Sequence, residues 1–351
     1  MKPLRWLYLP NEATEGDQVG PRKAFRLMHE QGLLAAYQAC SYLVAAERLQ
    51  RPDLVQQDLL AQVRAFEPDV VFLQHPSDRW GVDAAFLPQL KAVPSAPRLV
   101  VHEGDVYGRL LKPFDRTLRA ALAAADLAVV VGLGDLAARV RQAGAPRVLL
   151  APHSYDDERF DTPWQPPPTR PLDAVMIANL ACLKRIPGLY LPGGHRRKRL
   201  ARLFHHAYGK RFVVHGAGQG WRDEPYLRGP IVFGDQERVV RQAWLSINWT
   251  LFDEVPMYFS DRLPISLASG VAHITNHQPG IEQVLPGAEG LYLVQRPEEA
   301  LDVADALLSL PREQLIDIGL RGRAYARQRL RATRVYRDLV VAIGEHLFGD
   351  A

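Results

Sequence analysis

The chain has 351 residues, of which 47% are hydrophobic and 23% are charged, a composition typical of globular proteins that excludes wholesale disorder. At about 150 residues per domain, this length favours two domains. Its 43 Lys and Arg residues against 39 Asp and Glu residues give a formal net charge of +4, well short of the charge density that by itself marks a nucleic-acid-binding protein.

Neither a disulfide framework nor a membrane anchor is predicted. The two cysteines, Cys40 and Cys182, are too few for a zinc cluster or a disulfide scaffold, and their apolar surroundings predict packed, reduced thiols. The N-terminal sequence MKPLRWLYLP lacks the long apolar run of a signal peptide, and no apolar stretch approaches the roughly 18 residues of a membrane span. We therefore expect a cytoplasmic protein with no transmembrane segment.

In the first half, short apolar runs alternate with longer amphipathic runs, the pattern of βα units around a parallel sheet. A strand at 4–9 ends at Pro10, and a polar loop then leads into a helix from Pro21. A second helix stops at Glu67-Pro68. The later strands predicted in this half are 69–74, 99–102, 127–131 and 147–151.

A proline-dense segment, 161–171 (DTPWQPPPTRP), interrupts this alternation and predicts a stiff linker, because proline is excluded from helix interiors and central strands. The alternation then resumes. The predicted strands are 174–178, 212–215, 231–233, 245–248, 272–275 and 291–294, and the predicted helices are 196–207, 236–243, one that ends at Gly270, 297–309 and an Arg-rich tail.

These patterns predict an α/β protein made of two Rossmann-like domains with a cleft between them. We expect an N-terminal domain at 1–160, a linker at 161–171, a C-terminal domain at 172–330 and a C-terminal helix at 331–351. In open α/β sheets, ligands bind at the carboxyl ends of the strands, so the loops that follow the strands are where chemistry is expected.

Several motifs of the second half resemble the donor-binding domain of GT-B glycosyltransferases. The segment that begins at Ser260, SDRLPISLASGVAHITNHQPGIEQV, has an Arg-containing loop, a small-residue helix, a strand and a Pro-Gly-x-Glu loop in the order of that family. The likeness is greatest to the spore-maturation-protein-type branch of the group 1 glycosyl transferases. The motifs NLACLKRIPG, LPGGHRRKRLARL, VHGAGQGW and PEEALDVADA agree with it.

The resemblance implies a hexosyltransferase-like enzyme that moves a sugar from a nucleotide-diphosphate donor, with a UDP-sugar favoured, to an acceptor hydroxyl. It implies two facing Rossmann-like domains of GT-B type, with the C-terminal helix crossing back to the N-terminal domain. No separate cofactor and no metal ion are expected. The acceptor class stays open among a glycan, a small molecule, a protein and DNA.

The resemblance also points to cations for the donor diphosphate. Lys184, Arg185 and Arg262 are the candidates, because each lies on a loop expected to follow a strand and a cation stabilises a departing pyrophosphate. The alternative is that each is an ordinary solvated cation.

Two glycine-bearing loops are further donor-binding candidates. Gly280 and Glu282 open a helix after a strand, where backbone amides can meet phosphate, although a first-turn Glu is also an ordinary helix start. Gly20 lies in the loop 15–22 (EGDQVGPR), which lacks a full Gly-x-Gly-x-x-Gly motif.

One position departs from the family pattern. An acidic residue is usual in the helix that here contains Ile265 and Ser266. Three readings follow: Glu282 or Asp261 makes the contact instead, the donor is held differently, or activity has been lost.

For the acceptor side, the residues that follow the strands of the first half are the candidates. Asp105 is the first choice for the general base and His102 the second, because Asp and His are usual proton acceptors for a hydroxyl. Their alternatives are a loop-capping carboxylate and a packed imidazole. His75 and Asp78 follow the strand that ends at Gln74 and are candidates for acceptor binding.

Two further functions remain open from the sequence. The basic run 195–202 is typical of a solvated helix face, but together with the basic balance it motivates a glycosyltransferase that acts on hydroxylated bases of DNA. The missing acidic residue motivates a degenerate, non-catalytic protein that binds nucleotide-sugars.

Overall fold

The computed structural model describes residues 2–76 and 82–349, which form two compact units. Unit 1 comprises the chain up to Pro152 together with the C-terminal segment from Ala332, and unit 2 comprises His153–Arg331. The first crossing between units therefore lies at Pro152, before the proline-dense segment rather than at residue 160. No helix among the described residues is long and apolar enough to cross a membrane.

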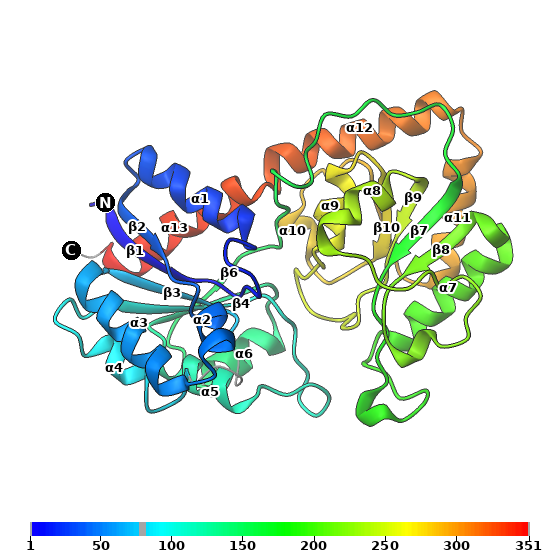
Figure 1. The fold of residues 1–351 in the computed structure, drawn as a ribbon. Coiled ribbons are helices and arrows are strands. Elements are labelled where there is room, and N and C mark those ends of the chain that lie inside the picture. The colour runs from blue at the N-terminus through cyan, green and yellow to red at the C-terminus, as the bar shows by residue number, and fades with distance from the viewer. Residues whose placement is uncertain (1, 77–81, 350–351) are drawn as a thin grey trace. The chain divides into compact units, whose positions relative to one another are not determined.

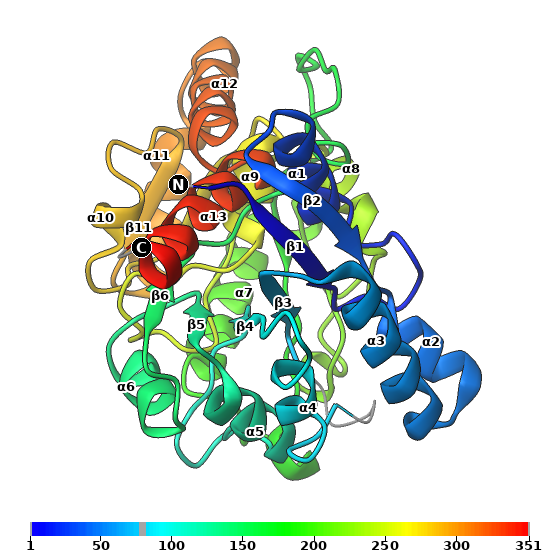
Figure 2. The same ribbon diagram turned by 90° about the vertical axis from the view of Figure 1, so that its left-hand side faces the viewer.

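Unit 1 is a six-stranded parallel sheet with the strand order β2-β1-β3-β4-β5-β6 (Figures 1 and 2). Its strands are β1 (Leu4–Leu9), β2 (Leu34–Ala39), β3 (Val70–Gln74), β4 (Arg98–Glu103), β5 (Leu127–Val130) and β6 (Val148–Leu150). Its helices are α1 (Val19–Glu30), α2 (Tyr42–Leu49), α3 (Pro52–Phe66), α4 (Leu87–Lys91), α5 (Arg116–Ala124), α6 (Asp135–Gln142) and α13 (Ala332–Phe348).

The C-terminal helix α13 belongs to unit 1, as the resemblance implied. It lies beside α1, and Tyr336 packs edge-on against Phe25 with ring centroids 5.4 Å apart (Figure 2). Phe25 in turn contacts Trp6 and Phe72 from the sheet. The aromatic core of unit 1 is therefore completed by a segment more than 250 residues distant in sequence.

Unit 2 is a five-stranded parallel sheet with the order β11-β10-β9-β7-β8. Its strands are β7 (Leu172–Ile177), β8 (Phe212–His215), β9 (Ala243–Ile247), β10 (Ala272–Asn276) and β11 (Leu291–Val294). Its helices are α7 (Gly194–Tyr208), α8 (Gln236–Val240), α9 (Arg262–Ala268), α10 (Ile281–Val284), α11 (Pro297–Leu308) and α12 (Arg312–Arg329), with short 3₁₀ turns that include Leu183–Arg185 and Phe233–Asp235. Two parallel α/β sheets confirm the predicted fold class.

Two elements differ from the sequence-based prediction. The predicted strand 231–233 is wrong: Val232 is 73% exposed, and Phe233 begins a 3₁₀ turn and packs edge-on against Phe160. Gly229-Pro230 and Gly234 bracket this run, which leaves too few residues to pair with a strand. The strand β2 escaped prediction because it lies at the edge of the sheet, where only Leu34 is fully buried and the apolar pattern is weak.

The proline-dense segment, predicted to be a stiff linker, belongs to unit 2 and is packed against it. The carboxylate of Asp161 accepts hydrogen bonds from α12, and the ring of Trp164 lies against Gly270. A Cβ built on Gly270, whose φ is +75°, would come within 2.7 Å of that ring. The segment thus contributes a fixed wall to unit 2.

Candidate functional site

Each sheet has a point where the strand order reverses, and in open α/β sheets this point is where ligands bind. In unit 2 the reversal lies between β7 and β9, and in unit 1 it lies between β1 and β3. The two candidate half-sites described next lie at the carboxyl ends of these strands.

A buried guanidinium closes the reversal point of unit 2. Arg197, on α7, donates from Nε to the carbonyl of Trp249, 2.6 Å away, and from Nη1 to the carbonyl of Asn179, also 2.6 Å away. These carbonyls follow β9 and β7, so one side chain joins the two strand ends. Burial, and then the charge of Arg262, lower the pKa of Arg197 to about 9.

The structure thereby brings Arg262 to the same strand ends. Arg262 is the first residue of α9, and its Nη1 lies 2.6 Å from Oδ1 of Asp261. Its side chain is 34% exposed. Because Arg262 is paired with Asp261, the net positive charge at these strand ends comes from the desolvated guanidinium of Arg197.

Lys184 and Arg185 lie in an exposed 3₁₀ turn after β7. Both have left-handed backbone angles, with φ of 50° and 59°. Such a conformation costs of order 1–3 kcal/mol per residue and is concentrated at functional sites. Their role in binding the donor stays a prediction.

The loop after β10 carries Gly280 and Glu282. Gly280 has a φ of +73° and precedes α10, a helix of one turn. Oε1 of Glu282 lies 2.7 Å from Nε2 of His277, and the hydrogen bond from its own backbone amide, then that from His277, hold the pKa of Glu282 below its usual value. This carboxylate is 62% exposed and available to a ligand hydroxyl.

The position that departs from the family pattern faces inward. Ile265 and Ser266 are both buried in α9, and the hydroxyl of Ser266 lies 2.8 Å from that of Ser246 on β9. These two side chains therefore pack α9 onto the sheet. Asp261 is partly exposed and Glu282 is exposed, so both carboxylates are accessible to a ligand.

In unit 1, a histidine and a buried carboxylate meet at the ends of β3 and β4. Nδ1 of His75 donates to Oε1 of Glu103 over 2.6 Å, and the Glu103 side chain is 3% exposed. The hydrogen bond and charge of Glu103 raise the pKa of His75 above its usual value, although burial opposes this, and burial raises the pKa of Glu103. With the Nδ1 proton held by the carboxylate, Nε2 of His75 is left to accept a proton.

Asp105 lies beside this pair but is engaged by a cation. Its Oδ2 lies 2.5 Å from Nζ of Lys112, and its backbone N–H donates to Glu103. Ligand atoms of His75, Glu103 and Asp105 lie within 4.8 Å of one another, a grouping able to hold a metal ion that the sequence did not reveal. From the sequence, His102 is the candidate base on β4. Because successive side chains of a strand point to opposite faces, Glu103 points to the face opposite His102.

Two further sequence-based candidates are buried in unit 1, and a third is not described. His102 is 8% exposed and packs on Phe72 and Tyr336, the packed imidazole foreseen as the alternative to a base. Gly20 lies buried in the first turn of α1. Asp78 lies outside the described residues.

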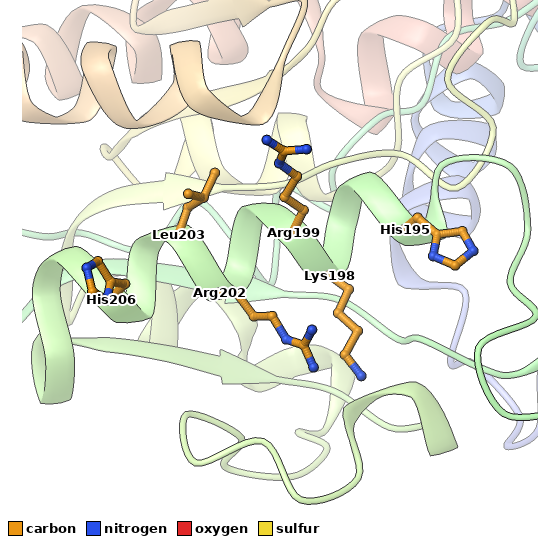
Figure 3. Close-up of a pocket in the computed structure, with 6 residues that line it drawn as sticks. All are labelled: His195, Lys198, Arg199, Arg202, Leu203 and His206. Atoms are coloured by element: carbon orange, nitrogen blue, oxygen red, sulfur yellow. The ribbon is translucent and has the colours of Figure 1, made fainter.

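The basic run of α7 forms an exposed face whose cations are paired. A hollow of about 310 Å³ is lined by Lys198 and Arg199 and, about one turn further along α7, by Arg202 (Figure 3). Lys198 and Arg202 both contact the carboxylate of Glu224, and Arg199 contacts that of Glu298. The charge of this face is thus largely compensated.

Comparison with known proteins shows which family model and which solved structures the chain resembles. Residues 196–340 match the family model described as glycosyl transferase-like. The chain is similar in structure to a glycosyltransferase from Rickettsia africae, with 10% identity, a TM-score of 0.60 and coverage of 99% of this chain and 100% of that one. Against Anabaena Alr3699/HepE in complex with UDP and glucose, the identity is 12%, the TM-score 0.58 and the coverage 97% and 99%.

A Listeria monocytogenes protein described as a UDP-N-acetylglucosamine 2-epimerase is also similar, with 11% identity, a TM-score of 0.55 and coverage of 99% of this chain and 98% of that one. No curated protein matches the sequence. The fold is that of the GT-B glycosyltransferases, as the motifs of the second half implied, and the spore-maturation-protein-type branch stays a prediction. Because transferases and an epimerase share this fold, activity has to be argued from the site.

Proposed function

We propose that the chain is a glycosyltransferase that moves a hexose from a UDP-sugar to an acceptor hydroxyl without a bound metal ion. The observation that supports this most directly is the pair Arg197 and Arg262 at the strand reversal of unit 2, within the segment that matches the glycosyl transferase-like model. HepE, which is similar in fold, has been solved with UDP and with UDP-glucose.

In this proposal, Arg262 binds the diphosphate directly, and the buried Arg197 stabilises the bound diphosphate through its positive charge. As the bond between the anomeric carbon and the diphosphate oxygen breaks, negative charge grows on the leaving phosphate. Arg197 is already committed to two carbonyls, so it acts by its charge and by fixing the strand ends, whereas Arg262 is exposed enough to contact the phosphate. Lys184 and Arg185 add further positive charge, and Glu282 accepts from a sugar hydroxyl.

His75 is the group that we assign as general base, in preference to Asp105. Nε2 of His75 takes the proton of the acceptor hydroxyl as that oxygen bonds to the anomeric carbon, and Glu103 stabilises the resulting imidazolium. Asp105 is a weaker candidate because its carboxylate is neutralised by Lys112. We assign Asp105 to positioning of the acceptor instead.

Metal independence is proposed because several atoms of the candidate ligand group are already engaged. Oε1 of Glu103 accepts from His75, and Lys112 holds Asp105, whereas Oε2 of Glu103 is buried without a partner among the described residues. The arginines of unit 2 supply the positive charge that a metal would otherwise bring to the diphosphate.

Nucleotide binding and turnover test the proposal together. Calorimetric titration with UDP, GDP and TDP measures binding, and UDP release from a panel of UDP-sugars measures turnover. The Arg262→Ala variant is expected to lose roughly 10²-fold or more in turnover, the usual effect of removing a leaving-group partner. Arg238→Ala is the matched control, because Arg238 is also an arginine of unit 2 paired with a nearby aspartate, and lies on α8.

The possible outcomes distinguish among the candidate functions. Failure to bind any nucleoside diphosphate refutes the proposal, and equal turnover in the Arg262 and Arg238 variants refutes the placement of the donor. Nucleotide binding without UDP release indicates the non-catalytic alternative, and isomerised sugar still attached to UDP indicates an epimerase. The paired cations of α7 give the DNA acceptor no specific support.

A further inference from the structure

A second cavity in unit 2 lies near the amino ends of the strands, whereas the donor half-site lies at their carboxyl ends. The cavity has a volume of about 650 Å³, and its lining includes Trp164 and Arg323. Trp164 lies against Gly270, which precedes β10, whereas the donor residues follow the strands. A volume between about 300 and 1,000 Å³ is typical of small-molecule sites. Figure 1 shows the green segment that carries Trp164 running along α12 before it enters β7.

The charge beside this cavity is unbalanced. The carboxylate of Asp161 accepts from three guanidinium groups: Arg327 at 2.6 Å, Arg331 at 2.8 Å and Arg323 at 3.2 Å. Arg323 and Arg327 also line the cavity, and the side chain of Arg323 is 6% exposed. Three positive charges that share one carboxylate leave an excess of two, and partial burial strengthens the resulting field.

Two more arginines lie behind Trp164, and one of them, Arg241, is paired with the carboxylate of Glu237 over 2.7 Å. Five arginines of this region therefore face the two carboxylates of Asp161 and Glu237. The guanidinium carbon of Arg241 lies 4.7 Å from the Trp164 ring centroid, and that of Arg170 lies 5.1 Å from it. Burial, and then the charge of Arg241, lower the pKa of Arg170 to about 10. The ring is thus held in place by cation–π contacts and by Gly270, and it offers the cavity a rigid aromatic surface.

The cavity also has an apolar side. Leu320 is 39% exposed and lines the cavity with Trp164 and Pro163. Ala324, one helical turn beyond Leu320 on α12, adds only a methyl group to this lining. Guanidinium groups on one side and apolar groups on the other match a molecule with an anionic head and an apolar body.

We propose that this cavity is a binding site for a small phosphate monoester with an aromatic or apolar portion, separate from the donor half-site. Arg323 and Arg327 face the phosphate, since guanidinium groups form paired, charge-assisted hydrogen bonds with phosphate oxygens. Trp164 and Leu320 contact the apolar portion. The bound phosphate supplies the negative charge that Asp161 alone does not, and so holds the segment around Trp164 against α12.

Phenyl phosphate is the probe, with inorganic phosphate and phenol as comparison ligands. Calorimetric titration of the full-length protein is done with saturating UDP present, so that binding at the donor half-site does not contribute. We expect phenyl phosphate to bind more tightly than inorganic phosphate, and phenol not to bind. Arg327→Ala and Ala324→Glu are each expected to weaken phenyl phosphate binding by about tenfold or more.

Matched control variants distinguish binding at the cavity from a general effect of the charge on α12. Arg329→Ala removes an exposed arginine from α12, and Gln314→Glu adds a carboxylate to the same helix; neither residue lines the cavity. Both controls are expected to bind phenyl phosphate as the wild type does. Retained UDP affinity and an unchanged melting temperature in Ala324→Glu show that this variant is folded.

Several results would overturn the proposal. These are no binding of phenyl phosphate at about 10 mM, where even a millimolar site is mostly filled, binding that disappears when UDP is present, and equal weakening by the cavity variants and their controls. Equal affinity for phenyl phosphate and inorganic phosphate would overturn the role of Trp164 and Leu320. Failure of UDP binding would refute the proposed function and leave this site unaffected.

Discussion

Replacing Glu103 by glutamine tests how unit 1 prepares His75 to accept a proton. The two side chains are 2.6 Å apart, and the carboxylate is almost completely shielded from water. In Glu103→Gln the amide keeps the size of the side chain and a hydrogen-bond acceptor but loses the charge. We therefore expect the pKa of His75, which Glu103 holds above its usual value near 6.5, to fall.

The expected loss of turnover follows from the roles assigned to the two residues. Removing the base itself, in His75→Ala, is expected to cost roughly 10²–10⁴-fold, the usual contribution of a general base. Removing the carboxylate that orients the base is expected to cost about 10–100-fold, as for comparable supporting partners. Since the base form of His75 is required, kcat/KM rises with pH through its pKa, and the rise occurs at lower pH in Glu103→Gln than in the wild type.

The pair of His75 and Glu103 also predicts how the free energy of unfolding changes with pH. Because the pKa of His75 is raised on folding, its stabilising contribution is fully present below its unfolded value near 6.5 and is lost as the pH rises through the folded value. The stability difference between wild type and Glu103→Gln is therefore expected to be larger at pH 6 than at pH 9. Urea unfolding at the two pH values measures it.

Two assays measure the change in proton affinity. UDP release with water as acceptor, recorded between pH 5.5 and 9, gives the acid limb of kcat/KM. Proton NMR of the His75 ring, assigned with His75→Asn, gives the pKa without any turnover. Glu47→Gln, an exposed substitution in unit 1, is the control. The reasoning fails if Glu103→Gln leaves both the acid limb and the NMR titration of His75 where they lie in the wild type.

Three further outcomes are expected. Gly270→Ala forces a left-handed φ on alanine and a Cβ against Trp164, and should cost about 1–3 kcal/mol in urea unfolding; an unchanged midpoint would contradict the packing of the proline-dense segment. Asp161→Asn removes the carboxylate that three arginines share and should lower the free energy of unfolding by about 2 kcal/mol at pH 7. The loss is smaller than for a fully buried pair because Arg327 and Arg331 are partly solvated. Although burial opposes it, contacts with Arg327 and Arg331 lower the pKa of Asp161, so this difference should be complete above about pH 4 and vanish as the pH falls through the folded value; equal differences at pH 7 and pH 3 would disprove it. EDTA should leave UDP release unchanged, and a loss restored by Mn²⁺ would show that the metal-binding grouping of unit 1 is used.

Local patterns in the sequence were enough to predict the fold class. Apolar runs of four to six residues separated by amphipathic stretches predict a parallel α/β protein, because a strand buried on both faces leaves little room for polar residues. The motifs around Arg262 and Gly280 then indicated the GT-B class, and placing chemistry after the strands directed attention to His75. These inferences need only the order of residues along the chain.

Partners across the fold could be found only in the tertiary structure. Which carboxylate meets His75 depends on the register of β3 against β4 and on the face to which Glu103 points. Likewise, in the sequence Arg197 is one cation of a basic run. Only the packing of α7 on the sheet shows that its side chain is buried. Burial and pairing over long sequence distances are collective results of packing, so composition and periodicity specify the elements but leave the contacts among them to the folded chain.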